Sequence, residues 1–259
     1  MKGLLGFSCV AVAITFLANT AAADFSPPAG LNAGDTFHWA FVTSTSRDAT
    51  SSNIADYNAH VNVAASALPD AGNAVNGVSG VSFLRDINWF AIASTPTVDA
   101  RDNIGDPLSP IYRFDGVRVA NNEADLFDGS SDPLLAPISV TEQGVSVFDS
   151  VWTGTDTAGL AADFSAPSWS VGSLGAGAVY TVFGLSGASD WQWVGMYTPG
   201  PSYQGIRPPT LQFPLYAISE PLTVVPVPGS FILGALGLAT TSALHRRRRR
   251  RTEVADSTR

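Results

Sequence analysis

The chain has 259 residues and a formal net charge of −8, and only 14 % of its residues are charged. Between Asp24 and Val225 six arginines stand against 20 carboxylates, and lysine is absent, so this part carries a net charge of −14. Such a surface repels phosphate groups and argues against nucleic-acid binding, and a single cysteine, Cys9, cannot support a disulfide framework or a thiolate metal site.

The N-terminus has the layout of a secretory signal peptide. Lys2 provides a short basic region, Leu4–Leu17 is apolar, and Ala21–Ala23 offers small residues for cleavage before Asp24. We therefore expect residues 1–23 to be a signal peptide, followed by an ectodomain over residues 24–218. Cys9 would be lost with the signal peptide.

One helix is predicted, and the sequence contains signals for both of its ends. Ser52 or Asn53 can cap it, Pro69 ends it, and the apolar residues recur at helical spacing, namely Ile54, Tyr57, Val61, Ala65 and Leu68. A loop rich in glycine and asparagine follows over 70–82.

Short apolar runs predict strands in most of the remaining ectodomain. Asp115-Gly116 between two such runs is the strongest hairpin signal. The predicted strands are Ile87–Ala93, Ile111–Phe114, Val117–Ala120, Val145–Thr153, Val179–Phe183 and Asp190–Met196, the last with Trp191 and Trp193 on one face. The pattern favours one strand-rich α+β domain with one or two helices, and residues 219–225 are expected to be a linker.

The C-terminus has three parts. Pro226, Val227 and Pro228 precede an apolar run, Gly229–Leu244, and then a block of arginines, which consists of Arg246, Arg247, Arg248, Arg249, Arg250 and Arg251. Six arginines cross hydrocarbon only at great cost, so they hold this end on the cytoplasmic side, with residues 252–259 as a cytoplasmic tail. As a helix the apolar run spans about 24 Å, somewhat less than a bilayer core, which suits a transient transmembrane anchor.

Two acidic clusters are candidate calcium sites. One contains Asp99, Asp102 and Asp106, and the other contains Asp125, Asp128 and Asp132. Calcium prefers several oxygen ligands from loops of this composition, but neither cluster has the EF-hand spacing. The alternative is that these aspartates are turn and helix-capping residues on an acidic surface.

The ectodomain lacks a recognisable catalytic set. Its histidines are His38 and His60, without a Gly-x-Ser-x-Gly elbow or a paired-histidine zinc motif, so both are interpreted as structural. The sequence therefore predicts a protein that is not an enzyme; a surface hydrolase is the minority alternative. The tryptophans are interpreted as core residues, with Trp191 or Trp193 as an alternative platform for a sugar ring.

The stretch from Phe41 to Trp169 resembles a family of bacterial secreted domains of unknown function, the DUF1554 type. The residues that carry the resemblance are Phe41–Ser44, Ala55-Asp56, Trp89, Ala91–Ser94, Asp99–Gly105, Gly116-Val117, Val119–Asn121, Asp125-Leu126, Pro137-Ile138, Val151–Thr155 and Gly159. The resemblance implies a C-type-lectin-like and endostatin-like fold. In a lectin-like loop, Asn121, Asn122 and Glu123 would be candidate contacts for a sugar or for calcium. Where family members carry cysteines, this chain has none.

The C-terminal segment resembles a PEP-CTERM sorting signal, the substrate of an exosortase, with Val227 in place of the motif's glutamate. This resemblance implies export, transient anchoring in the cytoplasmic membrane, processing by an exosortase-type enzyme, and transfer to the cell surface or extracellular matrix. We therefore expect an exported, non-enzymatic surface or matrix protein. The alternative is a calcium-dependent carbohydrate-binding module of the extracellular polysaccharide.

Overall fold

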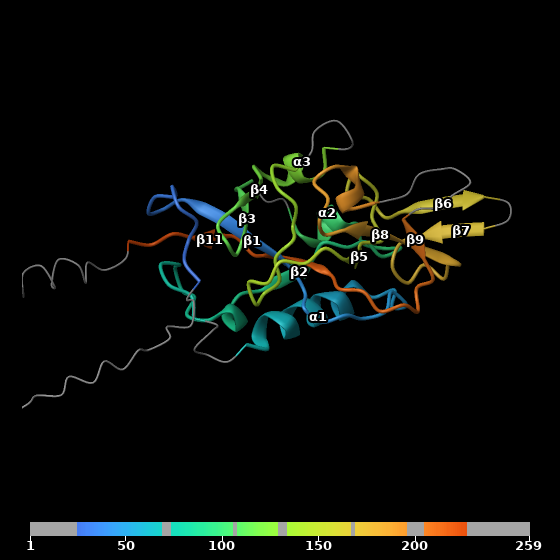
Figure 1. The fold of residues 1–259 in the computed structure, drawn as a ribbon, viewed down its shortest axis with the longest axis horizontal. Coiled ribbons are helices and arrows are strands. Elements are labelled where there is room, and N and C mark those ends of the chain that lie inside the picture. Colours follow the sequence, from blue (N-terminus) through green and yellow to red (C-terminus); the bar gives the residue numbers. More distant parts are fainter. Residues whose placement is uncertain are drawn as a thin grey trace, which may run out of the picture.

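The computed structural model describes residues 25–68, 74–105, 108–128, 134–166, 169–195 and 205–226. In chain order its elements are β1 (Thr36–Val42), α1 (Ile54–Ser66), η2 (Leu84–Asp86), β2 (Trp89–Ala91), α2 (Ala100–Asn103), β3 (Ile111–Arg113), β4 (Arg118–Ala120), α3 (Glu123–Leu126), β5 (Ser150–Trp152), β6 (Asp163–Ala166), β7 (Trp169–Gly172), β8 (Tyr180–Leu185), η3 (Trp191–Trp193), β9 (Ile206–Arg207), β10 (Tyr216–Ser219) and β11 (Leu222–Thr223). The predicted signal peptide and the segment from Val227 onward lie outside these ranges. The fold is a strand-rich α+β domain, as the sequence predicts (Figure 1).

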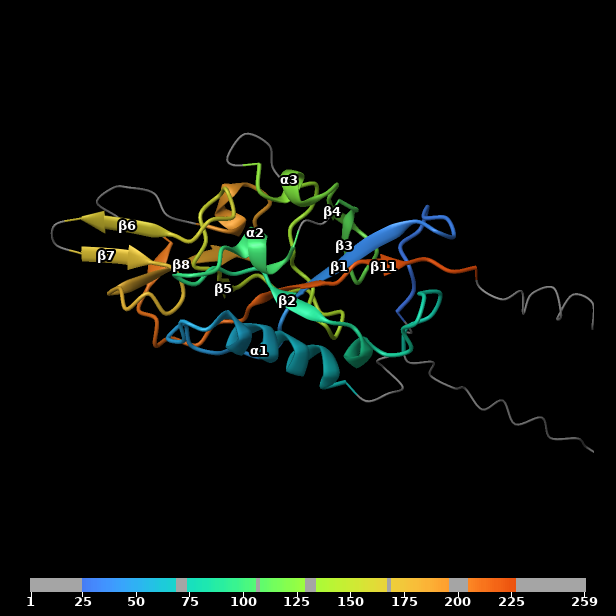
Figure 2. The ribbon, with the colours of Figure 1, turned by 180° about the vertical axis from the view of Figure 1, so that it is seen from behind.

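Within the described ranges the strands form two mixed sheets. The first has the order β2-β10-β1-β3-β4, with β11 also paired to β1, and the second has the order β5-β8-β7-β6, with β9 paired to β8. The hairpin of β6 and β7 lies at one end of the elongated domain, and β11 lies at the other (Figures 1 and 2). The two sheets therefore define the long axis of the molecule.

Strand β1 is the central strand of the first sheet, and both of its faces are buried. Phe37, Trp39 and Phe41 enter one core cluster, whereas Ala40 and Val42 enter another. This division follows the alternation of side chains along a strand. Because both faces are apolar, β1 lacks the polar–apolar alternation of a half-exposed strand, and it was not among the predicted strands.

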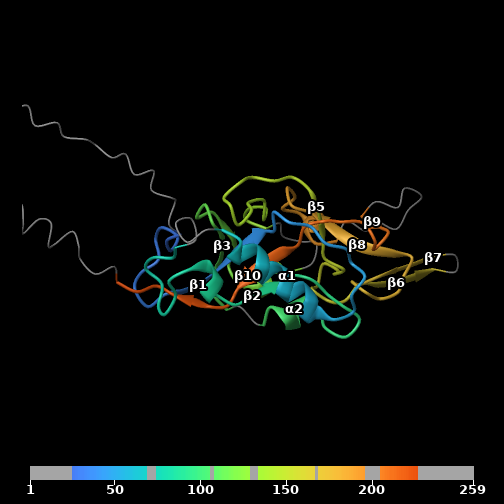
Figure 3. The ribbon, with the colours of Figure 1, turned by 90° about the horizontal axis from the view of Figure 1, so that it is seen from below.

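The predicted helix is confirmed as α1, which packs beneath the first sheet. Asn53 caps it, with its Oδ1 accepting a hydrogen bond from the Ala55 amide at 3.2 Å, and Tyr57 and Val61 are fully buried. Figure 3 shows α1 in front of β2 and β10. The last helical residue is Ser66, and the predicted stop, Pro69, lies outside the described residues.

Asparagine side chains replace a neighbouring strand along the outer edge of β2. The Asn62 amide donates to the Trp89 carbonyl at 2.7 Å and accepts from the Trp89 N–H at 3.1 Å. The Asn58 Oδ1 accepts from the Ala91 N–H at 2.8 Å, and the Asn103 Nδ2 donates to the Ala91 carbonyl at 2.7 Å. Asn58 and Asn103 also bond each other reciprocally at 2.9 Å. The edge of the sheet is thus closed by α1 and α2 rather than left open for pairing with another chain.

Two of the sequence predictions are wrong. The described part of the predicted strand 190–196, residues 190–195, is not a strand, because Asp190 caps the short helix η3 through a hydrogen bond from the Gln192 N–H to its Oδ1 at 3.1 Å. Residues 219–225 are not a linker, because β11 pairs with the start of β1 and Val224 bridges to Val78. The last described strand therefore belongs to the domain itself.

The remaining strand predictions hold to different extents. The hairpin around Asp115-Gly116 is confirmed as β3 and β4, and Val179–Phe183 corresponds closely to β8. Only Ser150–Trp152 of the predicted strand 145–153 and Trp89–Ala91 of the predicted strand 87–93 are strands. None of the helices in the described part of the chain is both long and apolar enough to cross a membrane.

Candidate functional site

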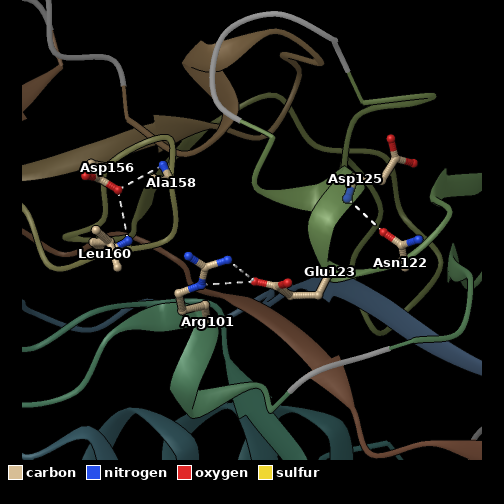
Figure 4. A network of polar contacts seen from close by, with 7 residues as sticks. All are labelled: Arg101, Asn122, Glu123, Asp125, Asp156, Ala158 and Leu160. Atoms are coloured by element: carbon tan, nitrogen blue, oxygen red, sulfur yellow. Dashed lines mark hydrogen bonds and ion pairs between the residues drawn. The ribbon is translucent and has the colours of Figure 1, made fainter.

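The predicted ligand contacts 121–123 lie at the start of α3, which faces α2 across a polar network (Figure 4). The Arg101 guanidinium of α2 donates two hydrogen bonds to Glu123 Oε1, from Nη2 at 2.9 Å and from Nε at 3.2 Å. Glu123 is only 8 % exposed, whereas Arg101 is partly open to solvent. A carboxylate this well buried needs such a partner, so the ion pair joins the two helices.

The side chains of Asn122 and Asp125 make local hydrogen bonds at the start of α3. Asn122 caps the helix, because its Oδ1 accepts from the Asp125 N–H at 2.9 Å. The Asp125 carboxylate in turn accepts from the backbone and side-chain nitrogens of Asn121, at 2.6 and 2.8 Å. The polar groups that were predicted as ligand contacts are thus used within the fold.

The described calcium candidates lie in or next to the short helices α2 and α3. Asp99 Oδ1 accepts from the Ala161 N–H at 2.6 Å, Asp102 lies in α2, and Asp128 follows α3. Asp125 lies in α3, and Asp106 and Asp132 lie outside the described residues. In the ranges that the structure describes, no group of three or more histidine, cysteine, aspartate or glutamate side chains could hold a metal ion.

One loop near this network was not singled out from the sequence. Asp156 Oδ1 accepts from the amides of Ala158 and Leu160, each at 2.9 Å (Figure 4). Gly159 packs its bare Cα against the Phe127 ring. The Gly159 carbonyl accepts from the Arg101 amide at 3.2 Å. This turn therefore contacts α2 through the Arg101 amide, and its aspartate is a turn-forming residue of the kind that Asp-x-x-Gly spacing indicates.

Among the described residues, no hydrogen bond joins His38 or His60 to a serine hydroxyl. The buried His38 on β1 bonds the Ser219 carbonyl through Nδ1 at 2.8 Å, while the Ser219 hydroxyl accepts from the Trp39 amide. On α1, the Nε2 of His60 lies 3.2 Å from the Thr45 hydroxyl. The first contact joins β1 to β10, and the second joins α1 to the segment that follows β1.

Folding stability is expected to fall as the pH drops below about 6.5, because burial lowers the pKa of His38 from that ordinary value while its bond to Ser219 opposes the shift. The unfolded chain then binds a proton before the folded protein does, so the loss begins near pH 6.5 and levels off below the folded-state pKa. The free energy of unfolding should be measured by urea titration at a series of pH values. His38→Gln should flatten this dependence.

The matched control for this prediction is His60→Gln. Burial also lowers the pKa of His60, so this variant should remove only the share of the pH dependence that His60 contributes. An unchanged slope in His38→Gln would contradict the prediction.

A buried carboxylate was missed in the sequence. Glu142 is 1 % exposed, and its carboxylate accepts hydrogen bonds from the Ser44 amide, at 2.9 Å, and from the Ser44 hydroxyl. It ties the segment after β1 to the turn 141–144, in which Gly144 donates to the Thr141 carbonyl. A single glutamate in a polar turn gives no pattern from which this contact could be predicted.

The described tryptophans differ in how deeply they are buried. Trp89 and Trp152 are buried as predicted, and Trp193 is 4 % exposed and stacks on Phe127 with ring centroids 5.9 Å apart. Trp193 is therefore not a surface platform for a sugar, and Trp191 is only partly buried. The side chain of Trp169 lies outside the described set.

The predicted sorting segment begins where the described chain ends. Pro226 is the last described residue, and Val227, Pro228 and Arg246–Arg251 lie beyond it. No protein-family model matches the chain, and a search of curated proteins found no match.

Proposed function

We propose that the protein is an exported, non-enzymatic cell-surface or extracellular-matrix protein, delivered by a C-terminal sorting signal of the exosortase type. One observation supports this proposal best: the domain closes immediately before the sorting segment. Strand β11, Leu222–Thr223, pairs with Thr36 and Phe37 at the start of β1, and Pro226 follows it within a few residues.

The position of the two described chain ends supports the same proposal. Phe25 bridges to Val75, and Val224 bridges to Val78, so both ends are fixed to the same short segment. They lie at one end of the domain, opposite the hairpin of β6 and β7 (Figures 1 and 2). Cleavage of the signal peptide before Asp24 and processing after Val225 would leave this domain intact, because both cuts fall outside its paired strands.

We further propose that the domain is C-type-lectin-like, as the resemblance of 41–169 implies. The strand-rich α+β class, the single long helix beside the first sheet and the pairing of the first and last described strands support this assignment. In such a fold, the ion pair of Arg101 and Glu123 holds α2 and α3 together.

Processing at the C-terminus is expected to remove the arginine block. Mass spectrometry of the protein recovered from the cell surface should show a C-terminus near Pro226–Pro228 in a strain with an exosortase, and an intact Arg259 in a strain without one. Pro226→Ala with Pro228→Ala should retain the tail in both strains. Val227→Glu restores the usual motif and should be processed at least as completely as the parent chain. Permanent recovery of the unprocessed full-length chain in the cytoplasm would refute the proposal.

A further inference from the structure

A surface pocket of about 460 Å³ lies between the residue pair that precedes β5 and the segment that follows β8. Phe148 and Asp149 line one side of it, and Gly187, Asp190 and Gln192 line the other. Its volume is in the range of small-molecule sites. The sequence predicts strands at 145–153 and 190–196, which include four of these residues, and it predicts no ligand-binding role for any of them.

The aromatic ring in this pocket is held at the surface by a glycine. Phe148 is 80 % exposed, so its ring lies outside the core. A Cβ placed on Gly187 would collide with Phe148 Cδ1 and would lie 3.2 Å from Cε1, so the ring rests directly on the Gly187 backbone. One side of the ring is thereby supported while most of its surface faces solvent.

Two carboxylates line the same pocket, and both are oriented by the backbone. Asp149 Oδ1 accepts from the Ser150 amide at 2.7 Å, and Asp190 Oδ1 accepts from the Gln192 amide at 3.1 Å. Both aspartates are exposed, and the ion pairs found in the described ranges join arginines to other acids, Glu123 and Asp115. The pocket thus combines an exposed aromatic face with two negative charges in a region of the chain whose net charge is −14.

We propose that this pocket binds a small organic ammonium ion, held by the face of Phe148 and by the carboxylates of Asp149 and Asp190. An aromatic face attracts a cation through its quadrupole, and methylated ammonium groups are the ligands for which such faces are used most. A neutral sugar would leave both carboxylates without a charge partner. A calcium ion would gain nothing from the ring and needs more oxygen ligands than two aspartates supply.

Choline is the probe for this proposal, titrated into the purified full chain by isothermal calorimetry at low ionic strength. Saturable binding that weakens as salt is raised is expected, since exposed charges are screened. Phe148→Ala should weaken binding about tenfold, and Phe148→Trp should strengthen it, because tryptophan is the best aromatic partner of a cation. Phe148→Leu keeps an apolar side chain and should bind as poorly as Phe148→Ala.

Gly187→Ala tests the geometry without touching a charge. The added methyl must displace the exposed Phe148 ring, so this variant should fold normally and yet lose choline affinity to the extent that Phe148→Ala does. Asp149→Asn and Asp190→Asn should each weaken binding and reduce its salt dependence. Leu135→Ala, at another exposed apolar residue, is the control and should bind as the parent chain does.

Three outcomes would overturn the proposal. They are the absence of saturable choline binding, equal affinity in the parent chain and Phe148→Leu, and displacement of choline either by glucose at equal concentration or by calcium chloride beyond the effect of sodium chloride at the same ionic strength. The pocket is independent of C-terminal processing, so its failure leaves the sorting proposal unaffected. Thermal unfolding of each variant shows whether a loss of binding reflects a loss of folding.

Discussion

Replacing Gly175 with alanine is expected to lower the free energy of unfolding by about 3 kcal/mol or more, whereas Gly177→Ala should lower it by about 1 kcal/mol. Both glycines have a positive φ, 67° and 70°, so both substitutions carry the same backbone strain. The two positions differ in the atoms that an added Cβ would meet. At Gly175 it would collide with the Ser51 carbonyl and the Ser52 nitrogen, while at Gly177 nothing lies within 4 Å.

The collision at Gly175 cannot be relieved by moving a flexible side chain. The Gly175 amide donates to the Ala49 carbonyl at 2.8 Å, and the Ser51 carbonyl accepts from the Tyr57 hydroxyl at 2.8 Å. The backbone on both sides of the contact is therefore fixed, and Tyr57 belongs to the buried face of α1. An alanine would push the turn after β7 away from the segment that leads into the helix.

Urea unfolding followed by tryptophan fluorescence measures both variants. Comparing the two variants separates the cost of the strained backbone from the cost of the steric collision, because Gly177→Ala carries only the backbone strain. Equal losses in the two variants would show that the close contact does not matter and would contradict the prediction.

Asn62→Ala is expected to cost about 2 to 4 kcal/mol, because it leaves both backbone groups of Trp89 without their hydrogen bonds to α1. A buried polar group that loses its partner costs about 1 to 3 kcal/mol. Trp89 is 1 % exposed, so water has little access to compensate. The substitution also uncovers the edge of β2, so increased self-association is expected on light scattering.

Val63→Ala is the matched control on the same helix. Val63 is 66 % exposed, and alanine is the better helix former, so this variant should unfold at the same urea concentration as the parent chain or at a higher one. If Asn62→Ala unfolds together with Val63→Ala, the amide contacts to β2 contribute nothing, and the proposed role of the asparagines is wrong.

Local chemistry was sufficient to predict some elements. Helix α1 was predictable because Asn53 caps it and its buried residues recur at helical spacing. The hairpin of β3 and β4 was predictable because Asp115-Gly116 supplies a turn: Gly116 has a φ of 82°, and Asp115 accepts from the Val117 amide at 3.2 Å. In both cases the residues that form the structure are neighbours in the chain.

Elements whose partners are distant were missed or misread. Asp190 to Met196 has the apolar content of a strand, but the Asp190 side chain bonds the backbone two residues later and turns the chain instead. The segment 219–225 has the look of a linker, and only its pairing with β1, some 180 residues earlier, makes it a strand. Asn58 and Asn62 look like ordinary polar residues of a helix surface, and their role is visible only beside β2.

The candidate site shows the same division. Composition and the order of segments were enough to predict an acidic, strand-rich domain and the layout of the two chain ends, because charge counts and apolar runs do not depend on folding. Only the tertiary structure pairs Arg101 with Glu123, buries Glu142 beneath Ser44, and sets Phe148 on Gly187 in a pocket that two aspartates also line. Each of these contacts joins residues that are at least 22 positions apart in the sequence, so it forms only when distant segments of the chain come together.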